Sequence, residues 1–178
     1  MQDIFIEYMV KKRNTPQITL LRIVMVIVTI IIVFSFLALS TSLGEFSFLA
    51  VLMAFGSVYL AYRYISSFNI EYEYSVTNGD MDVDKIISQR KRKRLMTVKL
   101  REVEDFGRYK ASEHEQKRYH TKIFACDSPR SEDLWFCTLN YREKGLTLLV
   151  FNASEKMLDG MKPFLPRPIM HRVFRIGG

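Results

Sequence analysis

The sequence of 178 residues has few of the residues that define several protein classes. It holds only 2 cysteines, 5 prolines and 8 glycines. This composition excludes a disulfide framework, a collagen-like repeat and a Pro/Gly-rich disordered chain. The glycines form no phosphate-binding loop or dinucleotide fingerprint, and the sequence contains no nucleophile elbow or paired-histidine metalloprotease motif. We therefore expect no enzyme activity and no cofactor.

Charge is missing from one long stretch of the chain. Glu45 is the one charged residue between Ile23 and Tyr62, although 25% of all residues are charged. As a helix, residues 23–43 would extend about 30 Å, which matches the hydrocarbon core of a bilayer. Residues 46–63 give a second, shorter apolar stretch. The sequence therefore predicts a transmembrane helical hairpin over residues 17–65, with spans at about 23–43 and 46–63.

A buried helix pair and a secretory signal peptide are the alternatives for this stretch. The rest of the chain is mostly polar and too short to cover two continuously apolar helices. The hydrophobic region of a signal peptide runs about 7–15 residues. Residues 23–43 form a longer run, and the segment before them contains Asp3 and Glu7. Both alternatives are weaker than an uncleaved hairpin.

The distribution of lysine and arginine predicts the orientation of the hairpin. Four of the 26 precede Ile23, none lies near Glu45, and the other 22 follow Tyr62. The positive-inside rule then places both termini in the cytoplasm, with the chain integral to the cell membrane.

The N-terminal segment, residues 1–16, allows two interpretations. Ile4, Phe5, Tyr8 and Met9 recur at helical spacing before three cations, which favours a short cytoplasmic helix in the membrane interface. A frayed tail fits equally well. Both interpretations leave the segment outside the domain that follows the hairpin.

Residues 70–166 have the pattern of a small β-domain. Tyr72, Tyr74 and Val76 alternate with polar residues, and Asn78-Gly79 supplies a tight hairpin turn. Further strands are expected at about 81–86, 95–103, 122–126, 134–141 and 146–151, with a turn at 90–94 and a loop at 107–116.

The end of the domain has the signals of a closing helix. Asn152 and Glu155 have the spacing of a capping box, which predicts a helix over about 153–165. The tail that follows, residues 167–178, either folds back onto the sheet or serves as a contact peptide.

Four scattered residues could suggest a metal site: His114, His120, Cys126 and Cys137. No close cysteine pair with zinc-site spacing is present, so we expect no metal. Pairing two strands about a turn at 128–133 would instead place Cys126 opposite Cys137 on a packed face. Both are then expected to be buried, free thiols in a reducing cytoplasm.

The segment from Ile70 to Val98, followed by Val103-Glu104-Asp105-Phe106, resembles the opening strands of bacterial pleckstrin-homology-like (PH-like) membrane proteins. The chain is also similar, over nearly its whole length, to a family of small two-helix membrane proteins from Gram-positive bacteria. The resemblance implies an α+β membrane protein with a transmembrane hairpin and a small antiparallel PH-like β-barrel or roll, closed by a C-terminal helix. Eukaryotic PH domains often bind phosphoinositides near their first hairpin. That role is not carried over, because Asp80 follows the Asn78-Gly79 turn here and Asp82 and Asp84 lie beyond it.

Five consecutive cations form the candidate site: Arg90, Lys91, Arg92, Lys93 and Arg94. Each could contribute about 1 kcal/mol near an anionic lipid surface, and the run could equally hold an acidic protein partner. The alternative is a solvated hairpin tip. Nucleic acid is a weaker candidate, because the cations are interleaved with acids and no binding motif is present.

Two functions agree with these features. The first is a membrane-anchored, non-enzymatic binding or scaffold protein whose PH-like domain contacts anionic headgroups or a protein. The second is an accessory subunit of a larger membrane complex, such as a transporter or envelope machinery, that interacts through the hairpin. Ala54, Gly56 and Ala61 mark places for close helix approach, within the hairpin or between protomers, so a homo-oligomer stays open.

Overall fold

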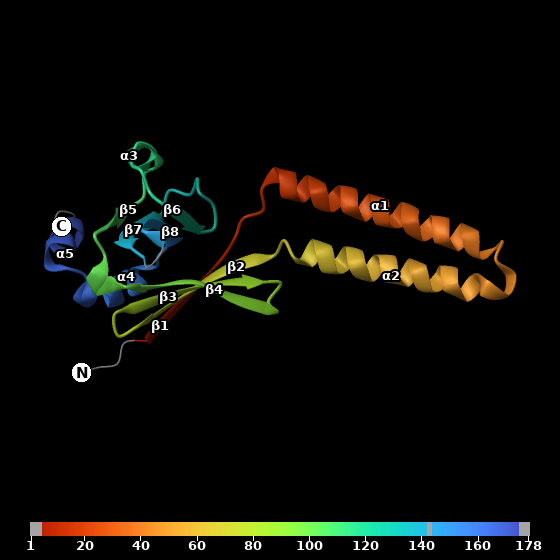
Figure 1. Ribbon diagram of the computed structural model, residues 1–178, viewed down its shortest axis with the longest axis horizontal. Helices are drawn as coiled ribbons and strands as arrows, with labels where there is room; N and C mark the ends of the chain where they lie inside the picture. The colour runs from red at the N-terminus through yellow and green to blue at the C-terminus, as the bar shows by residue number, and fades with distance from the viewer. Residues whose placement is uncertain (1–4, 142–143, 175–178) are drawn as a thin grey trace. The chain divides into compact units, whose positions relative to one another are not determined.

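The computed structural model describes residues 5–141 and 144–174, which divide into two units (Figure 1). The helical unit is Arg13–Asn69. The β unit combines the described residues before Arg13 with those from Ile70 onward. The expected Ile4 and the end of the tail, residues 175–178, lie outside the described residues.

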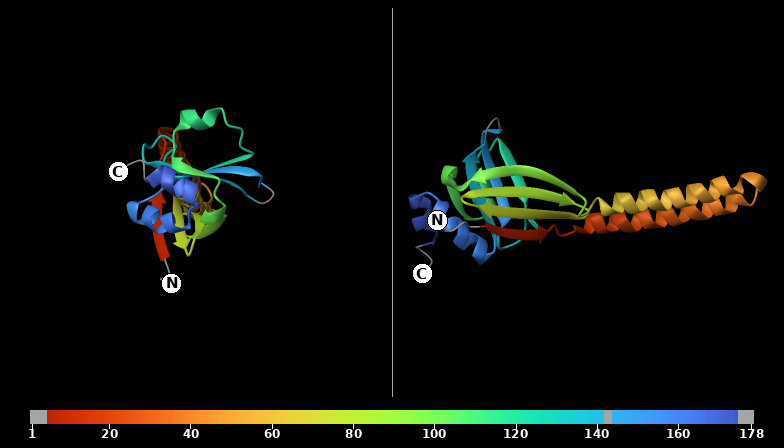
Figure 2. Two further views of the ribbon diagram at one scale, coloured as in Figure 1. Left: turned by 90° about the vertical axis from the view of Figure 1, so that its left-hand side faces the viewer. Right: turned by 90° about the horizontal axis from the view of Figure 1, so that it is seen from below.

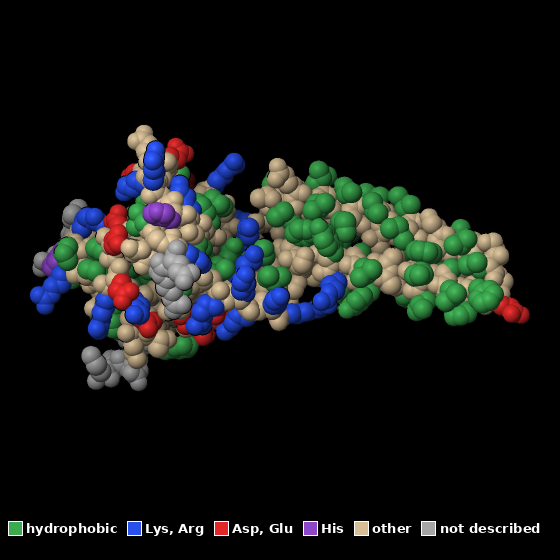
Figure 3. All heavy atoms as spheres, viewed as in Figure 1, with side chains coloured by type: hydrophobic (Ala, Val, Ile, Leu, Met, Phe, Trp, Pro, Cys, Tyr) green, Lys and Arg blue, Asp and Glu red, His purple; other side chains and the backbone are tan. Residues whose placement is uncertain are grey.

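The helical unit consists of two long apolar helices, α1 (Pro16–Ser40) and α2 (Ser47–Ser66), joined through the 3-10 turn η1 (Gly44–Phe46). No residue of α1 is buried, and α2 buries only Ala50 and Ala54. Most of their isoleucine, leucine and phenylalanine side chains are exposed, and apolar side chains cover much of the face of this unit that Figure 3 shows. Both helices are long and apolar enough to cross a membrane, which fits association with a lipid bilayer.

Polar side chains inside these helices satisfy their own backbone. The hydroxyls of Thr29 and Ser35 donate to carbonyls four residues earlier, at 2.7 and 2.8 Å, and Ser57 donates to the carbonyl of Ala54 at 2.7 Å. Arg22 donates to the Asn69 side chain at 3.0 Å, which ties the second turn of α1 to the third residue after α2. Serine and threonine are thereby tolerated in an apolar environment.

The β unit contains two four-stranded sheets. Sheet A has the antiparallel order β1 (Phe5–Lys11), β2 (Ile70–Thr77), β3 (Asp80–Ile87) and β4 (Lys91–Lys99). Sheet B has the order β5 (Asp105–Arg108), β7 (Leu134–Asn140), β8 (Leu146–Asn152) and β6 (Thr121–Ala125), with β6 parallel to β8. One hydrophobic core draws residues from both sheets, whose strands are seen from two further sides in Figure 2. Among the described strands the sheets stay separate, so the expected roll is present but its barrel is not closed.

Strand β1 shows that the prediction for the N-terminal segment was wrong. Residues 5–11 pair with β2 from Phe5 opposite Thr77 to Lys11 opposite Glu71. Every second residue faces the core, and Tyr8 stacks on Tyr74 with ring centroids 6.1 Å apart. A strand prevails over a helix because the open edge of β2 offers unpaired backbone groups and an apolar face that β1 completes.

Tyr74 connects the two sheets. It is fully buried on β2, and its hydroxyl donates to the carbonyl of Ala125 on β6. The same oxygen accepts the amide of Asn152 at 3.4 Å, and burial raises the pKa of the phenol. A single residue of sheet A thus bonds to two strands of sheet B.

The topology of sheet B corrects the predicted pairing of the cysteines. Strand β8 lies between β6 and β7 in the sheet. β6 and β7 therefore do not pair with each other as a hairpin about residues 128–133. Cys137 lies opposite Phe106 and Leu149, whereas Cys126 belongs to a separate small cluster. Because β6 and β8 are parallel, the chain must cross over between them instead of returning directly in a hairpin. The sequence prediction paired strands that are consecutive in the chain, and it therefore missed this crossover.

Asn152, at the end of β8, does not form the predicted capping box. The Asn152 side chain accepts the Asp127 amide at 2.9 Å and donates to its carboxylate at 3.0 Å, so it holds the chain after β6. Ser154 caps the next helix instead, because its hydroxyl accepts the Met157 amide at 3.3 Å.

The predicted closing helix, about 153–165, is divided into two short segments. α4 (Glu155–Met161) passes into the 3-10 turn η4 (Lys162–Phe164), and the predicted tail contains a further helix, α5 (Arg167–Phe174). α5 folds back onto the core, where Phe174 stacks on Trp135 at 6.1 Å between ring centroids. Residues 107–116 were predicted as a loop, but they contain the end of β5 and the short helix α3 (Ala111–Glu115).

The β1–β2 pairing predicts that the β unit folds without its hairpin. The Lys12 amide donates to the Ile70 carbonyl at 2.9 Å, so Asn-Gly in place of residues 13–69 should close the two strands as a tight turn. We expect this variant to be monomeric and folded by size-exclusion chromatography and amide NMR dispersion.

A matched fragment, residues 70–178, lacks β1 and exposes the apolar edge of β2. It should aggregate or show poor NMR dispersion. Equal folding of the two proteins would contradict the structural role of β1.

Candidate functional site

The five cations of the basic run do not form a turn. The turn between β3 and β4 is Ser88–Arg90, and β4 begins at Lys91. Ser88 and Gln89 both have positive φ, 54° and 56°. Sequence reasoning placed the turn too late because neither residue is the glycine or asparagine that this conformation usually selects. Only Arg90 of the run lies in the turn.

Strand alternation separates the other four cations onto two faces of sheet A. Lys91 lies opposite Ile87 and Lys93 opposite Lys85, while Arg92 and Arg94 lie opposite Ile86 and Asp84 on the other face. The register shifts between Val83 and Asp84, where β4 contains the extra residue Leu95. This bulge keeps Met96 on the core face although Arg94 points away from it.

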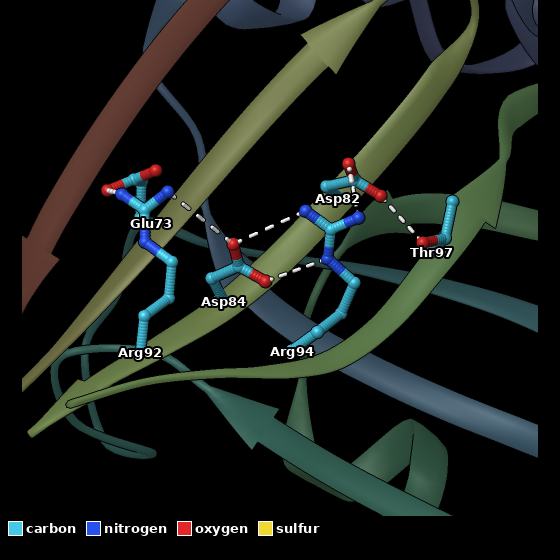
Figure 4. A network of polar contacts seen from close by, with 6 residues as sticks. All are labelled: Glu73, Asp82, Asp84, Arg92, Arg94 and Thr97. Atoms are coloured by element: carbon cyan, nitrogen blue, oxygen red, sulfur yellow. Dashed lines mark hydrogen bonds and ion pairs between the residues drawn. The ribbon is translucent and has the colours of Figure 1, made fainter.

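The arginines belong to an ionic network on the outer face of sheet A (Figure 4). Arg92 contacts the Glu73 carboxylate at 2.6 Å, and Arg94 contacts Asp82 at 2.9 Å and Asp84 at 3.0 Å. Only 8% of the Glu73 side chain and 6% of the Asp84 side chain are exposed.

The network has further polar support. The Thr97 hydroxyl donates to Asp82 at 2.6 Å, and the hydrogen bond to Asp84 raises the pKa of Arg94. Asp82 and Asp84, whose acidity argued against a phosphoinositide site near the first hairpin, are therefore partners of the basic run. The arginines neutralise these acids and stabilise the sheet.

The lysines have a different environment. Lys85, Lys91 and Lys93, which we call the lysine face, share one side of β3 and β4, and none forms an ion pair with the residues that the structure describes. Lys85 and Lys93 are directly opposite each other, an arrangement of like charges that destabilises a strand pair. An anion bound between them would remove this repulsion.

The lysine face lies at the end of sheet A where the chain leaves for the helical unit and returns from it. Lys11 is opposite Glu71 at this end, and Ile70 is opposite Ile87, next to the β3–β4 turn. We call it the hairpin end of the β unit. The antiparallel order of β1, β2, β3 and β4 fixes this proximity.

The four residues considered for a metal site do not come together. His114 is buried near Tyr119, while His120 lies beside Gly145. Both cysteines are buried and free. Burial raises the pKa of both thiols, to about 11 for Cys126, so they stay protonated and unreactive at neutral pH.

The small residues of α2 have two different roles. Ala54 is buried within the helix pair, whereas a methyl group at Gly56 would meet no atom within 4 Å. Gly56 lines an open apolar groove of about 650 Å³ together with Phe36, Leu52 and Leu60. Ala61 lines a second groove, of about 460 Å³.

One family model matches residues 2–171, and its description is Bacterial PH-like domain (DUF6106). No curated protein and no solved structure matches the chain. The match includes β1, both helices and the two sheets.

Neighbouring cations of equal charge should differ in their effect on stability. Arg94→Gln leaves the buried Asp84 without its closest cation and should lower the free energy of unfolding by about 1–2 kcal/mol, after allowance for an arginine that is half exposed. Lys93→Gln removes a repulsion and should change stability by less than about 0.5 kcal/mol, or raise it slightly. Thermal unfolding of both variants in uncharged detergent tests this, and a larger loss in Lys93→Gln would contradict the division of the run.

Proposed function

Since the chain belongs to the bacterial PH-like domain family (DUF6106), we propose that it is a membrane-anchored, non-enzymatic binding protein whose lysine face contacts anionic lipid headgroups. PH-like domains in general bind lipids or proteins. The observation that carries the proposal is the pair of Lys85 and Lys93, which lie directly opposite each other at the hairpin end and form no ion pair with any described residue.

The chain connection supports a position of the lysine face near the membrane. Ser67, Phe68 and Asn69 alone separate the last residue of α2 from Ile70. A connection of this length reaches at most about 14 Å. Because Ile70 pairs with Ile87, the β3–β4 turn is held to the same strand end from which this short connection departs.

Electrostatics favours an anionic surface as the partner of the lysine face. A lysine near such a surface gains about 1 kcal/mol, and the lysines need not first break an ion pair within the described part of the chain. Arg92 and Arg94 would have to leave Glu73, Asp82 and Asp84 to make the same contact. The lysines are therefore the contact residues within the basic run, with Arg90 beside them in the turn.

The proposed orientation places the β unit in the cytoplasm. The lysines and arginines are concentrated after the hairpin, in agreement with the positive-inside rule. β1 and β2 belong to one sheet, so the segments before α1 and after α2 must lie on the same side of the membrane. The cytoplasmic leaflet is also the anionic one, which supplies the lipids that the lysine face requires.

Amide hydrogen exchange of the full chain in nanodiscs tests the proposed contact. The backbone of residues 85–93 should exchange more slowly in discs of phosphatidylglycerol and phosphatidylcholine than in phosphatidylcholine alone. Lys85→Gln, Lys91→Gln and Lys93→Gln together should abolish this difference, since three such contacts are worth about 3 kcal/mol, or roughly 100-fold in docking.

The matched control removes three exposed cations elsewhere in the β unit: Arg101→Gln, Lys156→Gln and Arg167→Gln. It changes the net charge by the same amount and should keep the lipid-dependent protection. Equal loss in both triple variants would show a general charge effect and contradict a lysine-specific contact.

A protein partner of the hairpin is the second candidate function, and the open groove at Gly56 favours it. An accessory subunit of a larger membrane complex would present this groove to another helix. Crosslinking in native membranes separates the two functions. It is repeated with two variants, one whose hairpin is replaced by an unrelated hairpin and one in which Lys91 and Lys93 are changed to Gln. Loss of a crosslinked partner only with the replaced hairpin supports the accessory subunit.

A further inference from the structure

We propose a second binding site in the β unit, a pocket between β5, α3 and α5 that takes a small soluble molecule carrying a phosphate group. The pocket is open and has a volume of about 560 Å³. Its wall combines side chains of both signs with aromatic rings, among them Asp105, Arg108, His114, Lys117, Trp135 and Arg172. A second open pocket of about 520 Å³ shares Asp105, Lys117 and Arg172 with it.

The pocket lies away from the hairpin end of the β unit. β4 runs from Lys91 at the hairpin end to Lys99, and η2 (Leu100–Glu102) then leads to β5. The Leu100 amide donates to the carbonyl of Gly79, in the turn at the opposite end of sheet A from the β3–β4 turn. The chain just before α5 packs on the same turn, because the Phe164 ring is 2.8 Å from the place where a Cβ would stand on Gly79. α5 then supplies Arg172 to the pocket. This location favours a soluble ligand over a lipid headgroup.

Cations outnumber acids in the pocket wall. Asp105 is shared by Arg172, with which it forms a close ion pair, and Lys117, at 4.0 Å. Glu113 pairs at 3.3 Å with Lys110, which is not part of the wall. Among the described residues, Arg108 forms an ion pair only with the exposed carboxylate of Asp133, and exposed pairs of this type contribute little. Arg108 and Lys117 are thus available to an entering anion.

His114 is the second, independent feature. It is 2% exposed, and its Nδ1 is 2.7 Å from the Tyr119 hydroxyl, while its Nε2 is buried with no hydrogen-bond partner among the described residues. When Tyr119 donates to Nδ1, the neutral ring carries its proton on Nε2 and requires an acceptor there. Burial lowers the pKa of the imidazole, which favours this neutral form. A phosphate oxygen is an acceptor of the required kind.

Two ring contacts hold the imidazole in place. It stacks on Tyr109 with ring centroids 5.3 Å apart and meets the edge of Phe136 at 4.2 Å. The backbone of His114 is held as well, because its carbonyl accepts the Lys122 ammonium at 3.4 Å. An unpaired polar atom held this firmly is costly unless it has a partner. The preorganised ring would meet the ligand with little loss of entropy.

The pocket has a built-in reporter, because Trp135 lines it and is the one tryptophan of the chain. The test is a titration of Trp135 fluorescence with inorganic phosphate, using the full chain in uncharged detergent at constant ionic strength maintained with chloride. We expect a saturable change. Arg108→Gln with Lys117→Gln should weaken binding at least about tenfold, since two charge-assisted hydrogen bonds are removed.

The control variant, Arg101→Gln with Lys156→Gln, removes the same charge outside the pocket and should bind phosphate like the unmodified chain. His114→Phe keeps the ring packing and should also weaken binding. Because Arg108 lies 5.2 Å from the Trp135 ring and affects its emission directly, calorimetry provides the second measurement. A non-saturable response, or equal affinity in the Arg108/Lys117 variant and the control, would overturn the proposal.

A separate arm distinguishes a soluble phosphate from a lipid headgroup. Anionic nanodiscs without free phosphate should leave Trp135 emission as it is in phosphatidylcholine discs. A change caused by anionic lipid alone would overturn the assignment to a soluble ligand. This result is independent of the exchange protection expected at residues 85–93.

Discussion

Antiparallel pairing between β1 and β2 is the constraint on which the rest of the molecule depends. The two strands are neighbours in sheet A, yet the whole helical unit lies between them in the sequence. Their pairing brings both chain connections to one end of the sheet, and it completes the core face that receives Tyr8. The order of strands then puts the β3–β4 turn at that end, so the position of the lysine face follows from strand order.

The sequence was most informative where one pattern dominated. The long uncharged stretch predicted the helix pair, and alternation from Ile70 with the Asn78-Gly79 turn predicted β2 and β3. The strands of sheet B were predicted to within a residue or two, except for β5, which has only four residues. Their order was not, because local alternation indicates which face a residue occupies but not which strand is its neighbour.

The candidate site shows the same limit. Its residues were identified from their charge, but charge alone treats Arg90–Arg94 as one feature. In a strand, consecutive side chains point to opposite faces, so the four cations of β4 separate into two arginines that pair with acids and two lysines that form no ion pair with the described residues. The acids that neutralise Arg92 and Arg94 come from β2 and β3, and only the tertiary pairing of these strands shows it. His114 was also undervalued, because its burial depends on contacts with Tyr109 and Phe136.

The position of β1 before the helices has a consequence for biosynthesis. The ribosome makes β1 first, but its partner β2 emerges only after both helices, so sheet A cannot form until the hairpin has been synthesised. In the membrane topology proposed above, a chain that inserted only one helix would leave β1 and β2 on opposite sides of the bilayer, where they could not pair. In that topology, completion of the β unit would report correct insertion, and a misinserted chain would expose the apolar edge of β2 to proteases.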